Sequence, residues 1–215
     1  MRIAPEGRPF VVAGFAVLIA FAIPAALLGS GWWIAVAAWL PIALWVPWFF
    51  RDPERSGPRN ERVVIAPADG RVVSVAQVNE PTFLQGPATR ISIFMSVFDV
   101  HVNRYPVGGS VAWRHYEPGS FVNATLDKAS DRNERMSLGI EGPYGKVLVR
   151  QIAGLVARRI VTDAAVGDTA TQGVRLGLIR FGSRVDTFLT DPAHALVSVG
   201  DRTRAGVTPI AEWKP

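Results

Sequence analysis

The chain has 215 residues, with no cysteine and only three histidines. The absence of cysteine excludes disulfide bonds, thiolate catalysis and cysteine-ligated zinc or iron–sulfur sites. His101, His115 and His194 are far apart in the sequence, and their spacing does not indicate a metal site. We therefore expect no bound metal.

Charged residues are missing from one long part of the chain. None lies between Pro9 and Phe50, whereas both signs are frequent from Arg51 onward. Phe10–Gly29 and Trp32–Phe50 are apolar runs separated by a Gly-Ser-Gly break, and each is long enough to cross a bilayer as a helix. We predict an N-terminal hydrophobic α-helical hairpin that spans the membrane or enters it deeply.

Arginines flank this hairpin at both ends. Arg2 and Arg8 precede the first run, and Arg51 and Arg55 follow the second. A two-helix hairpin brings all four to one side of the membrane, which the positive-inside rule makes cytoplasmic. A cleaved signal peptide is the alternative, but a second apolar run directly behind the first argues against it. We expect a cell-membrane protein whose polar domain faces the cytoplasm.

The formal net charge of +5 limits the possible partners. A basic balance is compatible with nucleic acid, an anionic membrane surface or an acidic substrate. The arginines are scattered, and no lysine/arginine run or RNA-binding motif is present. With a membrane segment in the same chain, we expect a lipid membrane as partner and no nucleic acid.

The remainder of the chain reads as short strands separated by turns. The expected strands are Arg62–Ala66, Arg71–Val78, Arg90–Met95, Val111–Tyr116, Lys146–Ile152, Arg158–Val161 and Leu176–Phe181. Turn signals rich in Gly and Pro recur between them, which is typical of an antiparallel barrel or sandwich. We predict a mainly β, barrel-sandwich-like domain over residues 60–215, preceded by the membrane hairpin and a linker over residues 1–59.

Two stretches resemble strand-turn-strand units of lipoyl and biotinyl carrier domains. They are Val64–Val72 and Val166–Ile179, and both contain glycine at tight turns. Asp127-Lys128-Ala129 is also similar to a lipoyl-lysine hairpin. A non-enzymatic membrane adaptor or carrier, modified on Lys128, is therefore one alternative for the function.

Three further features contain groups with possible chemistry. Gly182-Ser183 follows an apolar strand, and alone such a dipeptide is an ordinary turn. The segment Phe94–Pro106 runs from a strand into a polar stretch that includes His101. Asp69 lies in Pro-Ala-Asp-Gly, where an aspartate commonly stabilises a turn. Each feature has a plain structural interpretation when it is considered alone.

In combination, these features resemble the phosphatidylserine decarboxylases, specifically their short bacterial and archaeal-type form. The resemblance covers nearly the whole chain. It comprises the apolar N-terminus, Pro67–Gly70, Phe94–Pro106, Glu117–Ala124, Asn133–Arg135 and Gly182-Ser183. Several ordered motifs at similar spacing are far more specific than any one of them.

The resemblance implies a precursor that cleaves itself without hydrolysis between Gly182 and Ser183. Ser183 Oγ attacks the Gly182 carbonyl carbon, and the ester that forms is eliminated to dehydroalanine, which hydrolyses to a pyruvoyl group and ammonia. A β chain of residues 1–182 and an α chain of residues 183–215 then associate as a heterodimer. A free hydroxyl is a weak nucleophile, so His101 and Asp69 are the candidates for the base and its orienting group.

The resemblance also implies that this covalent cofactor converts phosphatidylserine to phosphatidylethanolamine. The pyruvoyl carbonyl forms a Schiff base with the serine amine and accepts the electrons released as CO2 leaves. His101 is the candidate acid for protonating the α-carbon. Arg150, Arg158 and Arg159 are candidates to meet the lipid phosphate, although solvated surface charge explains them equally well. An ether-linked phosphatidylserine analogue shares the reacting headgroup and is a second possible substrate.

One position departs from the family pattern. Longer bacterial relatives carry Asp-Tyr-His-Arg-Val-His, and the second histidine belongs to their self-cleavage triad. Here Arg104 stands at that position, and His101 is the one histidine kept. A Ser–His–Asp triad therefore cannot be transferred directly: either His101 serves both steps, or His115 or another group replaces the missing histidine.

Overall fold

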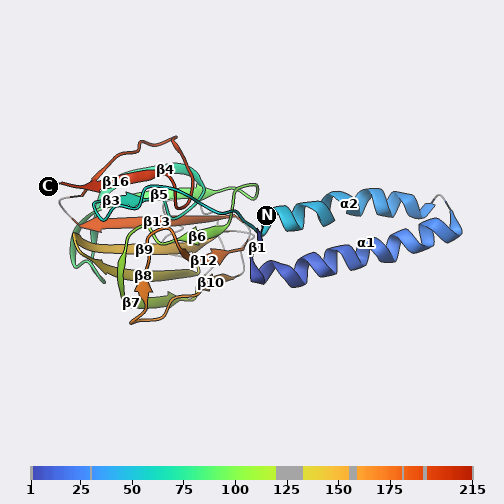
Figure 1. The fold of residues 1–215 in the computed structure, drawn as a ribbon, viewed down its shortest axis with the longest axis horizontal. Coiled ribbons are helices and arrows are strands. Elements are labelled where there is room, and N and C mark those ends of the chain that lie inside the picture. The colour runs from blue at the N-terminus through green and yellow to red at the C-terminus, as the bar shows by residue number, and fades with distance from the viewer. Residues whose placement is uncertain are drawn as a thin grey trace. The chain divides into compact units, whose positions relative to one another are not determined.

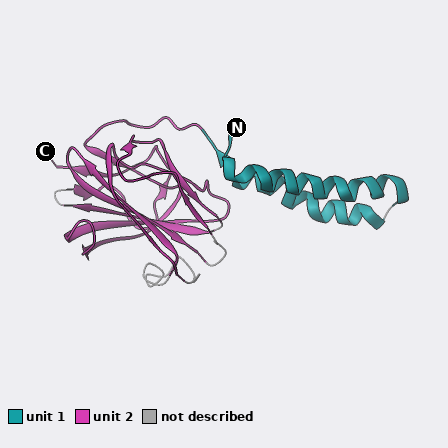
Figure 2. Cartoon of the chain, turned by 90° about the horizontal axis from the view of Figure 1, so that it is seen from below, with its two compact units in different colours: residues 1–53 teal, residues 54–215 magenta. Residues whose placement is uncertain are grey.

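A computed structural model of the protein describes residues 2–29, 31–119, 133–154, 159–180, 182–190 and 193–214. The first part of the chain is a pair of helices, and the rest is built from strands (Figure 1). The chain divides into two compact units, residues 1–53 and 54–215 (Figure 2). The expected fold class, a β domain preceded by an apolar helical hairpin, is confirmed.

The first unit is an antiparallel hairpin of two apolar helices. Its elements are β1 (Arg2–Ile3), η1 (Pro5–Gly7), α1 (Arg8–Leu28), α2 (Gly31–Phe49) and β2 (Arg51–Asp52). Gly14 of α1 faces Ala43 of α2, and the Trp39 indole donates a 2.8 Å hydrogen bond to the Gly14 carbonyl. Small residues permit such close helix packing. By length and composition, both helices are capable of crossing a membrane.

The second unit is an antiparallel β structure. Its described strands are β3 (Val63–Ile65), β4 (Gly70–Glu80), β5 (Gly86–Met95), β6 (Val102–Arg104), β7 (Gly109–Glu117), β8 (Arg135–Gly142), β9 (Gly145–Ala153), β10 (Ile160–Thr162), β11 (Thr169–Ala170), β12 (Arg175–Ile179), β13 (Ser183–Thr190), β14 (Ala193–Ala195), β15 (Arg202–Thr203) and β16 (Pro209–Trp213). A curled eight-stranded sheet has the order β11-β7-β8-β9-β13-β5-β4-β15 (Figure 1). Two three-stranded sheets have the orders β10-β12-β6 and β14-β16-β3.

The eight-stranded sheet has an inner and an outer face, because side chains alternate along each strand. On the inner face, Met95, Val149 and Val185 pack into the main core together with residues of β12 and β16. On the outer face, Phe188 and Leu148 form a smaller apolar cluster under the turn that follows β4. The inner face therefore carries the core, and the outer face leaves room for polar groups.

Two boundaries differ from the sequence-based expectation. The strand expected to reach Phe181 ends at Ile179, and Ser183 begins a new strand in another sheet. The expected linker also contributes to the second unit: Arg59 donates to the Gly206 carbonyl at 3.0 Å. A Cβ on Gly57 would lie 2.4 Å from the same carbonyl oxygen, so this approach requires glycine.

Candidate active site

The Gly182–Ser183 bond lies where the chain passes from one sheet to another. β12 ends at Ile179 in a three-stranded sheet, and β13 begins at Ser183 in the eight-stranded sheet. Gly182 has a φ of +64°, a left-handed conformation that favours glycine. Among the described residues, nothing lies within 4 Å of the position that a Cβ of Gly182 would occupy. The described side chains therefore leave space beside the residue whose carbonyl would be attacked.

Ser183 is completely buried on the inner face of the sheet. It is paired with Met95 of β5 on one side and with Ala153 of β9 on the other. Its hydroxyl donates to Met95 Sδ at 3.4 Å. Thioether sulfur is a weak acceptor, so this contact orients the hydroxyl without binding it strongly. The serine oxygen thus keeps its capacity to react.

A chain of hydrogen-bonded side chains leads from this serine across the core. Asn103 Nδ2 donates to the same Met95 sulfur at 3.6 Å. Gln151 Nε2 donates to Asn103 Oδ1 at 2.8 Å, and Thr162 Oγ1 donates to Gln151 Oε1 at 2.8 Å. Because Asn103 Oδ1 is an acceptor in this chain, its NH2 group is directed toward the sulfur that Ser183 contacts. Asn103 and Gln151 were not among the candidates from the sequence.

His101 is completely buried beside the end of β12. Its carbonyl accepts from the Ile179 amide at 3.4 Å, three residues before Gly182. Its Nδ1 lies 3.0 Å from the Asp99 carbonyl oxygen. A carbonyl can only accept, so Nδ1 carries the proton in this contact, and the neutral ring has its lone pair on Nε2. That nitrogen is the one able to act as a base.

Asp69 lies in the turn before β4, and its carboxylate is bonded to Arg55 and Ala205 rather than to His101. Arg55 Nη2 and the Ala205 amide donate to its two oxygens at 2.7 Å each. Burial raises the pKa of Asp69, and the Arg55 charge and the Ala205 amide offset only part of this effect. Asp69 is therefore a partly buried carboxylate held by an ion pair that includes an arginine of the expected linker.

Backbone contacts bring these segments together around the Met95 end of β5. The Arg104 amide donates to the Pro67 carbonyl at 2.9 Å, which joins the histidine segment to the Asp69 turn. A Cβ on Gly70 would lie 2.1 Å from the Phe94 carbonyl oxygen, so glycine is required there. The structure thus gathers the described segments that contain Asp69, His101 and Ser183 at one end of the sheet. The Ser183 hydroxyl nevertheless bonds neither His101 nor Asp69 among the described residues.

Arg104 and His115, the two residues considered for the missing histidine, lie in different places. Arg104 Nη1 donates to the Gly173 carbonyl at 3.1 Å. His115 lies on the exposed outer face, where its ring stacks on Trp113 and its Nε2 is 4.0 Å from Glu117. The sheet therefore separates His115 from the inward-facing serine. Among the described residues, no group of three His, Asp or Glu side chains is arranged to hold a metal.

The Asn133–Arg135 motif supports the strand beside Ser183. Asn133 Nδ2 donates to the Ala153 carbonyl at 2.7 Å, and the Ala153 amide donates to the Glu134 carbonyl at 2.9 Å. Ala153 is the β9 partner of Ser183, so this motif fixes the end of the neighbouring strand. The rest of the Glu117–Ala124 motif from residue 120 onward, the carrier candidate Lys128 and Arg158 lie outside the described residues.

A buried ion pair follows the serine directly on the outer face. Arg184 Nε and Nη2 donate to the two Asp186 oxygens at 2.6 and 2.9 Å, and Nη2 also contacts Ser92 Oγ at 3.1 Å. The side chains are 1% and 0% exposed. A forked arginine–carboxylate pair of this kind has a defined geometry. It anchors the beginning of β13 next to the candidate cleavage bond.

The fold and the candidate site together have three defining features. An apolar hairpin precedes an antiparallel β domain, in which a left-handed glycine is followed by a buried serine at the crossing between two sheets.

Comparison with known proteins identifies the family. The profile of the phosphatidylserine decarboxylase family matches residues 42–211. A relative from Symbiobacterium thermophilum is 50% identical over 97% of this chain and 94% of its own length. Relatives from Granulibacter bethesdensis and Magnetococcus marinus are 47% and 46% identical, over 98% and 99% of this chain and 85% and 95% of their own lengths. All three bear the name phosphatidylserine decarboxylase proenzyme. The chain belongs to the phosphatidylserine decarboxylase family, as its motifs predicted, and this enzyme family replaces the non-enzymatic carrier alternative.

Proposed function

We propose that this protein converts phosphatidylserine to phosphatidylethanolamine with a pyruvoyl group made from its own Ser183. Family membership supports the reaction, and the proenzyme names of the relatives support a processed precursor. The structural observation that carries the proposal is the position of Ser183. It is buried at the first residue of a central strand, directly after a glycine in the left-handed conformation.

In the proposed cleavage, Ser183 Oγ attacks the carbonyl carbon of Gly182. The C–N bond breaks as the amide nitrogen takes up a proton, and the peptide becomes an ester. Loss of the α-proton of residue 183 then breaks the Cβ–Oγ bond, which leaves Gly182 as a carboxylate and residue 183 as dehydroalanine. One water replaces the nitrogen, which departs as ammonia. No oxidant or reductant is required.

His101 is the proposed proton acceptor in this step. Its Nδ1 contact with the Asp99 carbonyl leaves the ring lone pair on Nε2, as a general base requires. Its backbone is bonded to β12 just before the cleavage bond. We assign Asp69 an orienting role for the segment rather than for the imidazole ring. Its ion pair with Arg55 fixes the turn against which the histidine segment rests.

The surroundings of Ser183 fit a small keto-acyl group. The position is closed to solvent, and Met95 offers a soft apolar surface to a methyl carbon. Asn103, oriented by Gln151, provides a hydrogen-bond donor beside the same sulfur. A pyruvoyl group at this position supplies a carbonyl that condenses with an amine and accepts the electrons released with CO2.

The two proposed chains would remain associated after cleavage. The α chain, residues 183–215, would contribute β13, which is hydrogen-bonded to β9 on one side and β5 on the other. Its β15 pairs with β4, and its β16 pairs with β3. Each of these partner strands belongs to the proposed β chain, residues 1–182. Separating the chains would therefore break the eight-stranded sheet in its interior.

We also propose that the hairpin holds the enzyme at the cell membrane with the β domain on the cytoplasmic side. The length and apolar composition of α1 and α2 support attachment. Arg2 and Arg51, which flank the helices, support the orientation. A membrane-held enzyme meets a lipid substrate in two dimensions, which suits phosphatidylserine or an ether-linked analogue of it.

Intact-protein mass spectrometry tests the proposal directly. The purified protein should contain a chain ending at Gly182 and a chain that begins at residue 183 and lacks a free amino terminus. Ser183→Ala should remain one chain and release no CO2 from phosphatidylserine. Active wild-type protein that consists of one uncleaved chain would contradict the proposal. Parallel assays with ester- and ether-linked lipids decide the backbone preference.

A further inference from the structure

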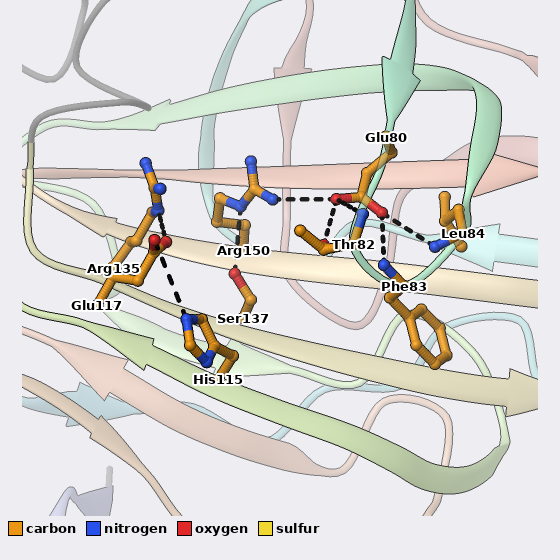
Figure 3. Close-up of polar contacts among 9 residues, drawn as sticks. All are labelled: Glu80, Thr82, Phe83, Leu84, His115, Glu117, Arg135, Ser137 and Arg150. Carbon is orange, nitrogen blue, oxygen red and sulfur yellow. Dashed lines mark hydrogen bonds and ion pairs between the residues drawn. The ribbon is translucent and has the colours of Figure 1, made fainter.

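The outer face of the eight-stranded sheet contains a pocket of about 280 Å³. It is lined by Val78, Asn79, Glu80, Pro81, Thr82, Arg90, Arg135, Arg150 and Phe188. Three of these residues carry guanidinium groups, and they come from β5, β8 and β9. Figure 3 shows two of them, Arg135 and Arg150, side by side on the sheet with Glu80 beyond Arg150. Ser183 faces the opposite side of this sheet, so the pocket is separate from the proposed catalytic site.

Arg150 lies at the centre of this group and contacts a hydroxyl group, an aromatic ring and one carboxylate. Its Nε donates to Ser137 Oγ at 3.1 Å, and its guanidinium carbon lies 4.8 Å from the centre of the Phe188 ring. Its contact with a carboxylate is long, 3.4 Å from Nη2 to Glu80 Oε1. The side chain is 15% exposed. Among the described residues, this mostly buried cation therefore has one ion pair, the long one to Glu80.

The carboxylate of Glu80 is hydrogen-bonded mainly to the turn that follows β4. Its carboxylate accepts from the Thr82 hydroxyl and from the amides of Thr82, Phe83 and Leu84, as Figure 3 shows. Burial alone would raise the pKa of Glu80, but these hydrogen bonds outweigh burial and lower the pKa. The charge of Glu80 is thus stabilised chiefly by the turn that joins β4 to β5. The long contact with Arg150 contributes less to stabilising the Glu80 charge.

The other nearby carboxylates are also engaged. Glu117 is bonded to Arg135, and Asp186 forms the forked pair with Arg184. Burial lowers the pKa of Arg150, and the positive charge of Arg135 lowers it further, while the charges of Asp186, Glu80 and Glu117 offset only part of this effect. Two like charges therefore lie close together at a partly enclosed site, where solvent screens them less than at an open surface.

We propose that this pocket binds an oxyanion of the phosphate class, with Arg150 and Arg135 as its cationic ligands. Planar guanidinium groups bind phosphate oxygens through paired N–H donors. A bound anion would neutralise the Arg135–Arg150 repulsion, and the apolar wall of Val78 and Phe188 would contact an organic portion of the ligand. A phospholipid headgroup and free phosphate present the same chemistry. The proposal does not depend on decarboxylation.

Two titrations of the full-length protein in detergent distinguish these sources. One uses inorganic phosphate at constant ionic strength, and the other uses a short-chain phosphatidic acid. We expect saturable binding by calorimetry in at least one titration. The ligand that binds more tightly shows whether the pocket prefers free phosphate or a phospholipid headgroup. Arg150→Gln should weaken that binding about tenfold or more, since a charged hydrogen bond is lost. Arg71→Gln is the matched control, because Arg71 is an exposed arginine of the same sheet outside the pocket.

The absence of saturable binding in both titrations would overturn the proposal, and so would an Arg150→Gln protein that binds as tightly as wild type. Arg150→Lys and Arg135→Lys keep the charge but lose the forked donors, and they provide the test if the glutamine variant does not fold. Both should fold and bind more weakly. Ser183→Ala should bind like wild type, so a failure of the cleavage proposal is distinguishable from a failure of this one.

Discussion

Gln151 donates a 2.8 Å hydrogen bond to Asn103, and both side chains are completely or almost completely buried. This bond fixes which end of the Asn103 amide faces the Met95 sulfur. The donor end points to Met95 Sδ, which Ser183 also contacts. If Ser183 reacts as proposed, an oriented donor on the same sulfur is able to stabilise negative charge that develops nearby.

We predict that Asn103→Leu slows self-cleavage about tenfold or more, because the oriented donor beside the serine is lost. The rate is measured on freshly translated precursor by the appearance of the small chain on a denaturing gel. Thr162→Val, at the far end of the same chain of hydrogen bonds, should have a smaller effect. A folded Asn103→Leu precursor that matures at the wild-type rate would exclude this role.

His101 and His115 should respond differently to removal. His101→Ala should stop cleavage and decarboxylation, because it removes the buried ring that we propose as the base. His115→Ala should leave both within about twofold, since an exposed surface position usually tolerates substitution. Chain masses and CO2 release measure the two steps. If His115→Ala blocks cleavage in a folded protein, the opposite-face placement does not describe the reacting state.

The buried Arg184–Asp186 pair should contribute strongly to stability. Asp186→Asn would leave the Arg184 charge in the protein interior without its carboxylate, at a cost of about 3–5 kcal/mol in the free energy of unfolding. Denaturant unfolding in the Ser183→Ala background measures this without interference from cleavage. The double variant Arg184→Met, Asp186→Leu should recover much of the loss, because it removes both charges together. A double variant no more stable than Asp186→Asn would contradict this account.

Glu80 should make the β4–β5 turn sensitive to acid. Its folded-state pKa is lowered from the ordinary value of 4.5, so the ionised form stabilises the native state. That stabilisation is fully present above pH 4.5 and is lost as the pH falls through the lower folded-state pKa. Glu80→Gln should therefore be less stable than wild type at neutral pH, with a smaller difference in acid. Unfolding curves of both proteins across this pH range measure the difference in stability. A difference that grows in acid would contradict the predicted direction.

The sequence predicted the hairpin and seven of the fourteen described strands of the β domain, because these depend on local patterns. The long apolar runs and the alternation in segments such as Arg71–Val78 are visible without tertiary information. β13 was not predicted, because the charged residues Arg184 and Asp186 indicate a solvent-exposed segment. In the structure they form a buried ion pair. Charge pattern alone does not distinguish a buried ion pair from two solvated groups.

The candidate site was predicted only in part, for a similar reason. Gly182, Ser183, His101 and Asp69 were proposed from motifs, and the fold brings their segments to one end of a sheet. The contact of Asn103 with Gln151 joins residues 48 positions apart, so it depends on strand order. Arg55 was assigned to a linker, and its bond to Asp69 follows from the path of that segment over the β domain.

The complete burial of Ser183 has a consequence for the type of chain break that this fold tolerates. Ordinary hydrolysis before residue 183 would create an ammonium group at a position with no access to solvent. An unpaired charge there would be strongly unfavourable and would tend to expel the strand from the sheet. A break that converts residue 183 to an uncharged keto-acyl end avoids this cost. The interior position of the serine thus favours a chemical route that gives the new chain a neutral beginning.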